Sequence, residues 1–173
     1  RAAKAARADA GLTAEDVDAI IVATSTADFT FPSCATMIQS GLGMTRGFAF
    51  DVQAVCAGFA FALTTANALI LAGQAKRVLV IGAETFSRLM DWTDRGTCVL
   101  FGDGAGAAIF TPLEVAKRGE YLGGSISMEG GAEDVLAQPG GGSRFPASPD
   151  TIEKRLHFMK MGGTKVFRFA VRV

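Results

Sequence analysis

Apolar residues in this chain fall into short unbroken runs and longer helical stretches, separated by glycines and polar turns. Unbroken runs of strand length are typical of strands buried on both faces of a sheet. Such runs occupy residues 17–23, 48–52, 77–82 and 107–110, and a further strand is predicted at 121–128. Helical patterns occupy residues 1–10, 33–39, 56–72 and 161–173. Gly11 is predicted to end the first of these helices and Ser33 to cap the second. This alternation of strands and helices indicates the α/β class.

The helix predicted at residues 56–72 lies at the centre of this pattern. A strand at 48–52 precedes it and a strand at 77–82 follows it, so we expect a right-handed βαβ crossover and a parallel strand pair. The helix has almost no polar face. A membrane span needs about 20 mostly apolar residues, but the polar residues on either side of this stretch favour a helix buried in a protein core.

Both ends of the sequence interrupt a pattern. Residue 1 falls inside one helical stretch and Val173 inside another, and neither end carries a helix stop signal. We therefore expect the chain to be a fragment of a longer protein. Residues 130–150 are rich in Gly, Ser and Pro and are predicted to form a surface excursion.

Composition narrows the class of protein. The 17 basic and 17 acidic side chains balance, which argues against a generally basic nucleic-acid-binding surface. The three cysteines include no CxxC pair, and the single histidine indicates no metal-ligand cluster. Reduced thiols without a signal peptide are typical of a cytoplasmic protein. We expect no metal, no nucleic acid and no membrane as partners.

Cys56 is the candidate nucleophile. It stands where the strand at 48–52 passes into the helix, so its thiol faces unpaired backbone N–H groups and the positive end of the helix dipole, which favour the thiolate. A lone cysteine in an apolar stretch is usually an inert small side chain. The strand-to-helix position reverses that expectation. Cys34 and Cys98 lack this setting and are interpreted as structural.

A glycine-rich run, 101–106, is similar to a phosphate-binding loop but stands before a strand, whereas a dinucleotide fingerprint requires a helix there. We interpret its glycines as allowing close backbone packing or positive φ angles near the core. Arg95, close to Trp92, is either a solvated charge or a clamp for a phosphate or a purine. His157 is a poor candidate base because basic residues surround it.

Four segments taken together call for a comparison with a known family. They occur in order and at matching spacing. They are Asp51-Val-Gln-Ala-Val-Cys-Ala-Gly-Phe59, Ile81-Gly-Ala-Glu-Thr85, Asp94-Arg-Gly-Thr97 and Phe101-Gly-Asp-Gly-Ala-Gly-Ala107. In combination they closely resemble the β-ketoacyl-acyl-carrier-protein synthase III family of bacterial fatty-acid synthesis. The resemblance covers essentially the whole chain.

The resemblance implies a thiolase-like layered fold with a mixed sheet and a buried central helix, in a homodimer of chains with two similar halves. Residues 1–115 then correspond to the N-terminal half, incomplete at its start. Residues 116–173 correspond to a connecting strand, a surface loop and the beginning of the C-terminal half.

The resemblance also implies a reaction. In the family, the cysteine that matches Cys56 attacks acetyl-CoA and becomes an S-acetyl thioester. Malonyl-acyl carrier protein then loses CO2, and the resulting carbanion attacks the thioester to give acetoacetyl-acyl carrier protein. Acetyl-CoA is a substrate here, and the resemblance implies no metal or redox cofactor.

Further residues take roles from the same resemblance. Arg95 matches an arginine at the adenine and phosphate end of CoA, and Phe101 matches a phenylalanine lining the channel near the cysteine. Phe31 matches the phenylalanine that closes the acyl pocket of the dimer partner. Residues that match the lining of the pantetheine tunnel are Met161, Gly163 and Phe167.

One departure is large. The family's histidine and asparagine, from His-Gln-Ala-Asn and Gly-Asn-Thr motifs, have no counterpart in this sequence. Loss of such a donor removes several kcal/mol of transition-state stabilisation, so we expect this chain alone to be inactive. Alternatives are a related synthase with another acyl-CoA starter, a non-catalytic scaffold of the same fold, and a nucleotide-binding module, which the order of elements disfavours.

Overall fold

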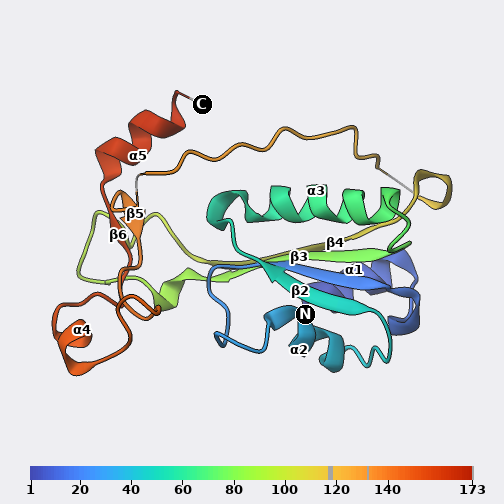
Figure 1. Ribbon diagram of the computed structural model, residues 1–173, viewed down its shortest axis with the longest axis horizontal. Coiled ribbons are helices and arrows are strands. Elements are labelled where there is room, and N and C mark those ends of the chain that lie inside the picture. The colour runs from blue at the N-terminus through green and yellow to red at the C-terminus, as the bar shows by residue number, and fades with distance from the viewer. Residues whose placement is uncertain (117–118, 132, 173) are drawn as a thin grey trace. The chain divides into compact units, whose positions relative to one another are not determined.

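The computed structural model describes residues 1–116, 119–131 and 133–172 (Figure 1). The chain forms two compact units. Unit 1 comprises residues 1–84 and 104–126, and unit 2 comprises residues 85–103 and 127–173. The predicted halves, 1–115 and 116–173, refer to the family fold and stay a prediction. Residues 117, 118, 132 and 173 lie outside the described residues. They belong to the predicted second half, and residue 173 also belongs to the predicted terminal helix.

Unit 1 is built on a four-stranded mixed sheet with the order β2-β1-β3-β4. Its strands are β1 (Ala19–Ala23), β2 (Phe48–Val52), β3 (Val78–Thr85) and β4 (Asp103–Phe110). β1 pairs in parallel with both neighbours, so that Ile21 lies opposite Phe50 on one side and Val80 on the other. All five residues of β1 are buried, as an unbroken apolar run predicts.

The expected parallel pair between residues 48–52 and 77–82 is wrong in one respect. Those segments form β2 and β3, but β1 lies between them and pairs with both. The most apolar strand takes the central position because a central strand is covered on both faces and both edges. The α3 crossover (Gly58–Leu71) therefore passes over one intervening strand.

Helices cover both faces of this sheet (Figure 1). Alternate residues of β1 point to opposite faces, and they belong to two separate apolar clusters. Ile20 and Val22 pack with residues of α1 (Ala2–Ala10) and α2 (Cys34–Gly41). Ile21, with its two alternate neighbours, packs with residues of α3. The expected helix ends are confirmed, because Gly11 ends α1 in the left-handed conformation and the Ser33 side chain caps α2.

Within this chain, the α3 helix is buried on the side that faces the sheet. Its buried residues are Gly58, Ala62 and Ala66, spaced so that they share the face against the sheet. Small residues on this face let the helix approach the strands closely. Phe59 is partly exposed and Leu71 is 78% exposed. An almost wholly apolar sequence therefore does not by itself ensure burial on every side within this chain.

Residues 119–126 are extended but form no strand, so the strand predicted at 121–128 is wrong. Gly119 and Gly123 have positive φ angles, which interrupt the regular extended conformation that strand pairing requires. The segment is attached through Tyr121, whose ring meets Phe110 edge-on at 6.2 Å between centroids. The hydroxyl of Tyr121 lies 3.0 Å from Thr64 Oγ1 on α3.

Unit 2 has little regular structure. It contains α4 (Pro149–Glu153), α5 (Gly163–Ala170) and a short antiparallel pair of β5 (Leu136–Ala137) with β6 (Lys160–Met161). The predicted helix at 161–173 is therefore α5, which begins two residues later. Short 3-10 turns complete the two units at Ala14–Asp16, Val55–Ala57, Phe86–Arg88 and Leu113–Val115.

Candidate active site

Cys56 lies in a sharp turn between β2 and α3. The 3-10 turn Val55–Ala57 follows the end of β2, and the α-helix begins at Gly58. Cys56 therefore lies just before the helix, whereas the sequence pattern predicts it in the first helical turn. The Cys56 thiol is free and exposed. The turn that the strand-to-helix pattern predicted for the nucleophile is present.

The backbone before Cys56 is strained. Val55 has φ 46°, a left-handed conformation that is a genuine outlier for a β-branched residue. At Gly58, a Cβ atom would lie 3.3 Å from the Cβ of Ala23, so the glycine lets the start of α3 lie close to β1. Strain of this kind persists only where the surrounding structure holds it, and it concentrates at functional sites. The strained turn leaves the Cys56 thiol exposed.

Two carboxylates hold the loop that carries Phe31. At its start, Glu84 on β3 accepts a hydrogen bond from the Ser25 N–H at 2.8 Å and one from the Thr26 hydroxyl at 2.6 Å. At its end, Asp51 on β2 accepts hydrogen bonds from the N–H groups of Cys34 and Ala35, each at 2.8 Å. The loop is anchored at both ends to strands of the sheet.

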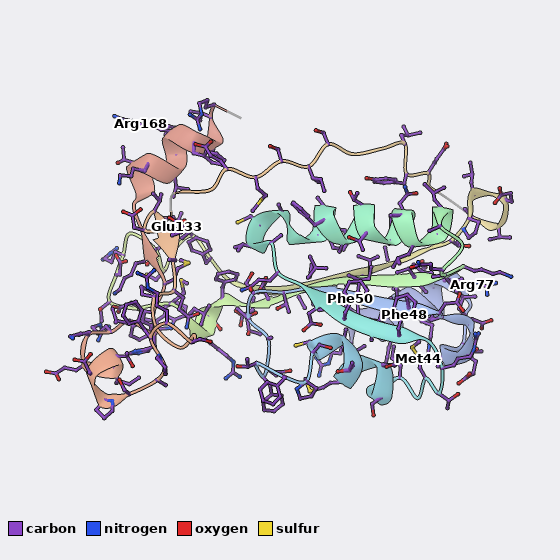
Figure 2. All side chains as sticks on the ribbon, in the orientation of Figure 1. Met44, Phe48, Phe50, Arg77, Glu133 and Arg168 are labelled. Atoms are coloured by element: carbon purple, nitrogen blue, oxygen red, sulfur yellow. The ribbon has the colours of Figure 1, made fainter. Side chains whose placement is uncertain are left out.

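Phe31 itself is 82% exposed in this loop. The sequence motifs contain Asp51 and Glu84, but sequence reasoning assigned neither of them a role. The signal in the sequence was an acidic residue near the end of each of two strands of the sheet. Figure 2 shows Phe48 and Phe50 on β2, the edge strand of the sheet, where their rings stack at 6.4 Å between centroids.

The other predicted binding residues belong to unit 2. Arg95 is exposed in a turn where Asp94 Oδ1 accepts from the Gly96 N–H at 2.9 Å and Oδ2 accepts from the Thr97 hydroxyl at 2.8 Å. Thr97 is buried, so this turn is tied to the interior of its unit. Arg95 forms no ion pair with any residue in the described ranges. Its guanidinium is therefore available to an anion.

Phe101 stacks on Phe86 with 5.6 Å between ring centroids. The segment between them is closed by Asp103, whose carboxylate accepts from the N–H and the hydroxyl of Ser87 at 2.8 and 2.7 Å. The Ser87 hydroxyl bond, followed by the backbone bond, lowers the pKa of Asp103 below its ordinary value. The loop that carries Arg95 thus returns on itself, with Phe101 at its closing end.

Met161, Gly163 and Phe167 lie along β6 and α5. Met161 pairs with Leu136 in the short sheet, and the Gly162 N–H donates to the Val135 carbonyl at 2.7 Å. Gly163 begins α5, and Phe167 on this helix is 67% exposed. Unit 2 therefore holds all five predicted CoA-binding and tunnel residues, whereas Cys56 and Phe31 belong to unit 1.

The structure corrects the interpretation that the glycines of the run 101–106 allow close packing or positive φ angles. The strand that follows is confirmed and begins within the run, since β4 starts at Asp103. Neither Gly104 nor Gly106 has a positive φ angle, and a Cβ atom on either would meet nothing within 4 Å. Close packing within this chain therefore does not explain these glycines.

Cys34 and His157 are two of the remaining residues that the sequence analysis considered. Burial raises the pKa of Cys34 above its ordinary value, although an Asp28 backbone bond opposes this. The His157 ring lies 4.1 Å from that of Phe158, and its Nδ1 is buried without a hydrogen-bond partner among the described residues.

No group of three possible metal ligands occurs among the residues that the structure describes. None of their helices combines the length and apolar character needed to cross a bilayer.

Comparison with known proteins places this arrangement in context. The family model for 3-oxoacyl-[acyl-carrier-protein] synthase III matches residues 50–127, which include Cys56, Arg95 and Phe101. A β-ketoacyl-[acyl-carrier-protein] synthase III from Rhodobacter capsulatus is 58% identical over 99% of this chain. The predicted family resemblance is confirmed. The chain spans about half the length of the curated relatives it matches, and 52% of this one.

Solved structures confirm the predicted thiolase-like α/β fold. The 3-oxoacyl-(acyl carrier protein) synthase III of Pseudomonas aeruginosa matches with a TM-score of 0.83 and 37% identity, over 96% of this chain and 50% of that one. The priming β-ketosynthase of a polyketide biosynthetic pathway matches with a TM-score of 0.79 and 29% identity, over 98% of this chain and 49% of that one. The sequence comparisons and the structure comparisons therefore find similarity to the same family.

Proposed function

We propose that the protein to which this chain belongs is a condensing acyltransferase that starts fatty-acid synthesis. The observation that carries the proposal is the 58% identity to a synthase III across a chain whose cysteine stands on a strained strand-to-helix turn. A cysteine on such a turn is suited to covalent catalysis, because the helix N-terminus offers unpaired N–H groups to a developing negative charge.

In the proposed reaction, the Cys56 sulfur attacks the carbonyl carbon of acetyl-CoA. A carbon–sulfur bond to Cys56 forms, the bond to CoA breaks, and CoA leaves as a thiol. Malonyl-acyl carrier protein then loses CO2, and its carbanion attacks the S-acetyl carbonyl and releases Cys56. Arg95 binds the phosphate end of CoA, Phe101 lines the channel, and Met161, Gly163 and Phe167 line the pantetheine tunnel. No metal or redox cofactor takes part.

The proposal includes a homodimer in the cytoplasm, with Phe31 closing the acyl pocket of the partner. Two features support the dimer. Phe31 is largely exposed on an anchored loop, and β2 is an edge strand that carries two stacked phenylalanines. Unpaired edge strands bind other strands readily. We expect this chain alone to be inactive, because it contains neither the His-Gln-Ala-Asn nor the Gly-Asn-Thr motif.

A second candidate is a related synthase with a different acyl-CoA starter. The match to a polyketide priming β-ketosynthase favours keeping it. A non-catalytic scaffold of the same fold is disfavoured by the retained, exposed Cys56. Turnover of acetyl-, butyryl- and isobutyryl-CoA by the full-length protein distinguishes the starters.

Mass spectrometry tests the proposal. The full-length protein is incubated with acetyl-CoA, and the intact protein and its Cys56 peptide are weighed. We expect one acetyl group on Cys56, absent in Cys56→Ala and retained in the matched control Cys34→Ala. An unmodified Cys56, together with full activity in Cys56→Ala, would contradict the proposed mechanism.

A further inference from the structure

An ion pair inside unit 2 holds the loop that carries Arg95. Asp91 is only 6% exposed. Its Oδ2 accepts from Arg155 Nε at 3.0 Å, and its Oδ1 lies 2.5 Å from an Arg155 terminal nitrogen. This two-point geometry is the strong form of an arginine–carboxylate contact. The partners are 64 residues apart in sequence, so the pair links two segments of the unit.

Arg155 is held in place for this contact. It has φ 54°, which is uncommon for a residue other than glycine. Its guanidinium lies 4.9 Å from the centroid of the Phe158 ring, a cation–π distance. The Met159 N–H donates to the Leu89 carbonyl at 2.9 Å and joins the same two segments beside the ion pair. The backbone pays a conformational cost to aim this arginine at Asp91.

Asp91 also shapes the turn that leads to Arg95. Its Oδ1 accepts from the Thr93 N–H at 3.0 Å and from the Thr93 hydroxyl at 2.6 Å, and its carbonyl accepts from the Asp94 N–H at 2.9 Å. Asp94 in turn accepts from the two residues after Arg95. Arg95 therefore extends from a continuous series of turns whose first fixed point is Asp91.

A purely structural role explains this pair poorly. Asp91 is buried but the Arg155 side chain is 48% exposed, and an ion pair with a partner at the surface adds little net stability. Asp91 without Arg155 would be a buried carboxylate with no cationic partner, four positions before the exposed Arg95. Arg155 occupies both of its oxygens and so leaves Arg95 without a competing partner.

We propose that Arg155 is a positioning residue that acts through Asp91: it fixes the turn carrying Arg95 and keeps the Arg95 guanidinium free for the phosphates of acyl-CoA. This inference rests on the proposed function. A turn ordered before binding loses less entropy when the ligand arrives, so the pair supports acyl-CoA binding without touching the reacting atoms.

The test uses the full-length protein and the variants Arg155→Met, Arg155→Lys, Asp91→Asn and the double variant Asp91→Asn/Arg155→Met. Lys154→Met is the matched control, because Lys154 is adjacent and forms an exposed ion pair with Asp150 at 2.7 Å. The readouts are KM for acetyl-CoA, kcat, and hydrogen exchange of the peptide spanning residues 89–100.

We expect Arg155→Met to raise KM for acetyl-CoA on the order of ten- to a hundredfold, the scale of a misplaced binding group, with little change in kcat and faster exchange of the peptide. Arg155→Lys restores part of KM, because it keeps the charge but not the two-point contact. The double variant binds acetyl-CoA better than Arg155→Met, because it no longer carries a free carboxylate near Arg95. Lys154→Met matches the wild type.

Three results overturn the inference. One is an unchanged KM in Arg155→Met and Arg155→Lys, whether or not exchange is faster. Another is a loss of kcat and a rise in KM that are equally large in all variants, including the control Lys154→Met. The third is a double variant that binds no better than Arg155→Met. If Arg155→Met does not fold, Arg155→Lys and Asp91→Asn decide the KM question. Failure of the proposed function differs from these, because the wild type itself then neither binds CoA nor becomes acylated.

Discussion

Replacing Asp51 with asparagine tests how β2, the strand before Cys56, is tied to the loop that carries Phe31. Each carboxylate oxygen of Asp51 accepts one backbone N–H from the first turn of α2. An asparagine side chain has one acceptor oxygen, so one of the two N–H groups loses its partner. The Ala35 N–H belongs to a fully buried residue, so water does not replace that partner.

The expected loss in unfolding free energy follows from these contacts. A hydrogen bond to a charged group contributes about 1.5–3 kcal/mol. A negative charge at a helix N-terminus adds about 0.3–1 kcal/mol. Asp51→Asn should therefore destabilise the protein by about 2–4 kcal/mol, and the loop end at Cys34 should become more mobile.

Denaturant unfolding of the full-length protein measures this loss through the shift in midpoint at constant slope. Asp150→Asn is the control, because Asp150 forms an exposed ion pair of the kind worth about 0–1 kcal/mol. A change within about 0.5 kcal/mol for Asp51→Asn would refute the reasoning. So would an equal change in the two variants.

Two further substitutions follow from the structure. Gly47→Ala should destabilise the protein by about 2 kcal/mol more than Gly43→Ala, as measured by denaturant unfolding: both positions have positive φ, but only at Gly47 does the added Cβ run into backbone, the Asp18 carbonyl. Equal losses would contradict the clash. Hydrogen bonds, chiefly from Arg155, hold the pKa of Asp91 well below its ordinary value, so its contribution is present above the unfolded pKa of about 4 and is lost only as pH falls toward the folded value. The stability difference between wild type and Asp91→Asn should be constant from about pH 5 to 8 and shrink in acid. A difference that grows in acid would reverse the sign of this argument.

The local structure of unit 1 was predictable because it depends on short-range patterns. The apolar run at residues 17–23 predicted β1, and Gly11 and Ser33 predicted helix ends, since each signal acts within a few residues. The order of strands was not predictable in the same way. Nothing near residues 48–52 or 77–82 states that β1 pairs with both, because that choice depends on burial summed over the whole sheet.

The candidate site shows the same division. A cysteine between a strand and a helix is a local pattern, and it predicted the position of Cys56 at the start of α3 to within one turn. The anchors Asp51 and Glu84, and the Asp91–Arg155 pair, join residues far apart in sequence. A single acidic or basic residue in a loop carries no signal of its distant partner. Contacts of this kind follow from the folded chain alone.

The left-handed Val55 has a consequence for protein engineering. A glycine or asparagine at this position relieves a conformation that costs about 1–3 kcal/mol, so a selection for thermal stability alone favours replacing it. The gain comes from loosening the residue immediately before Cys56. We therefore expect stability and the presentation of Cys56 to compete at one backbone position, so libraries made to stabilise this protein should hold Val55 fixed.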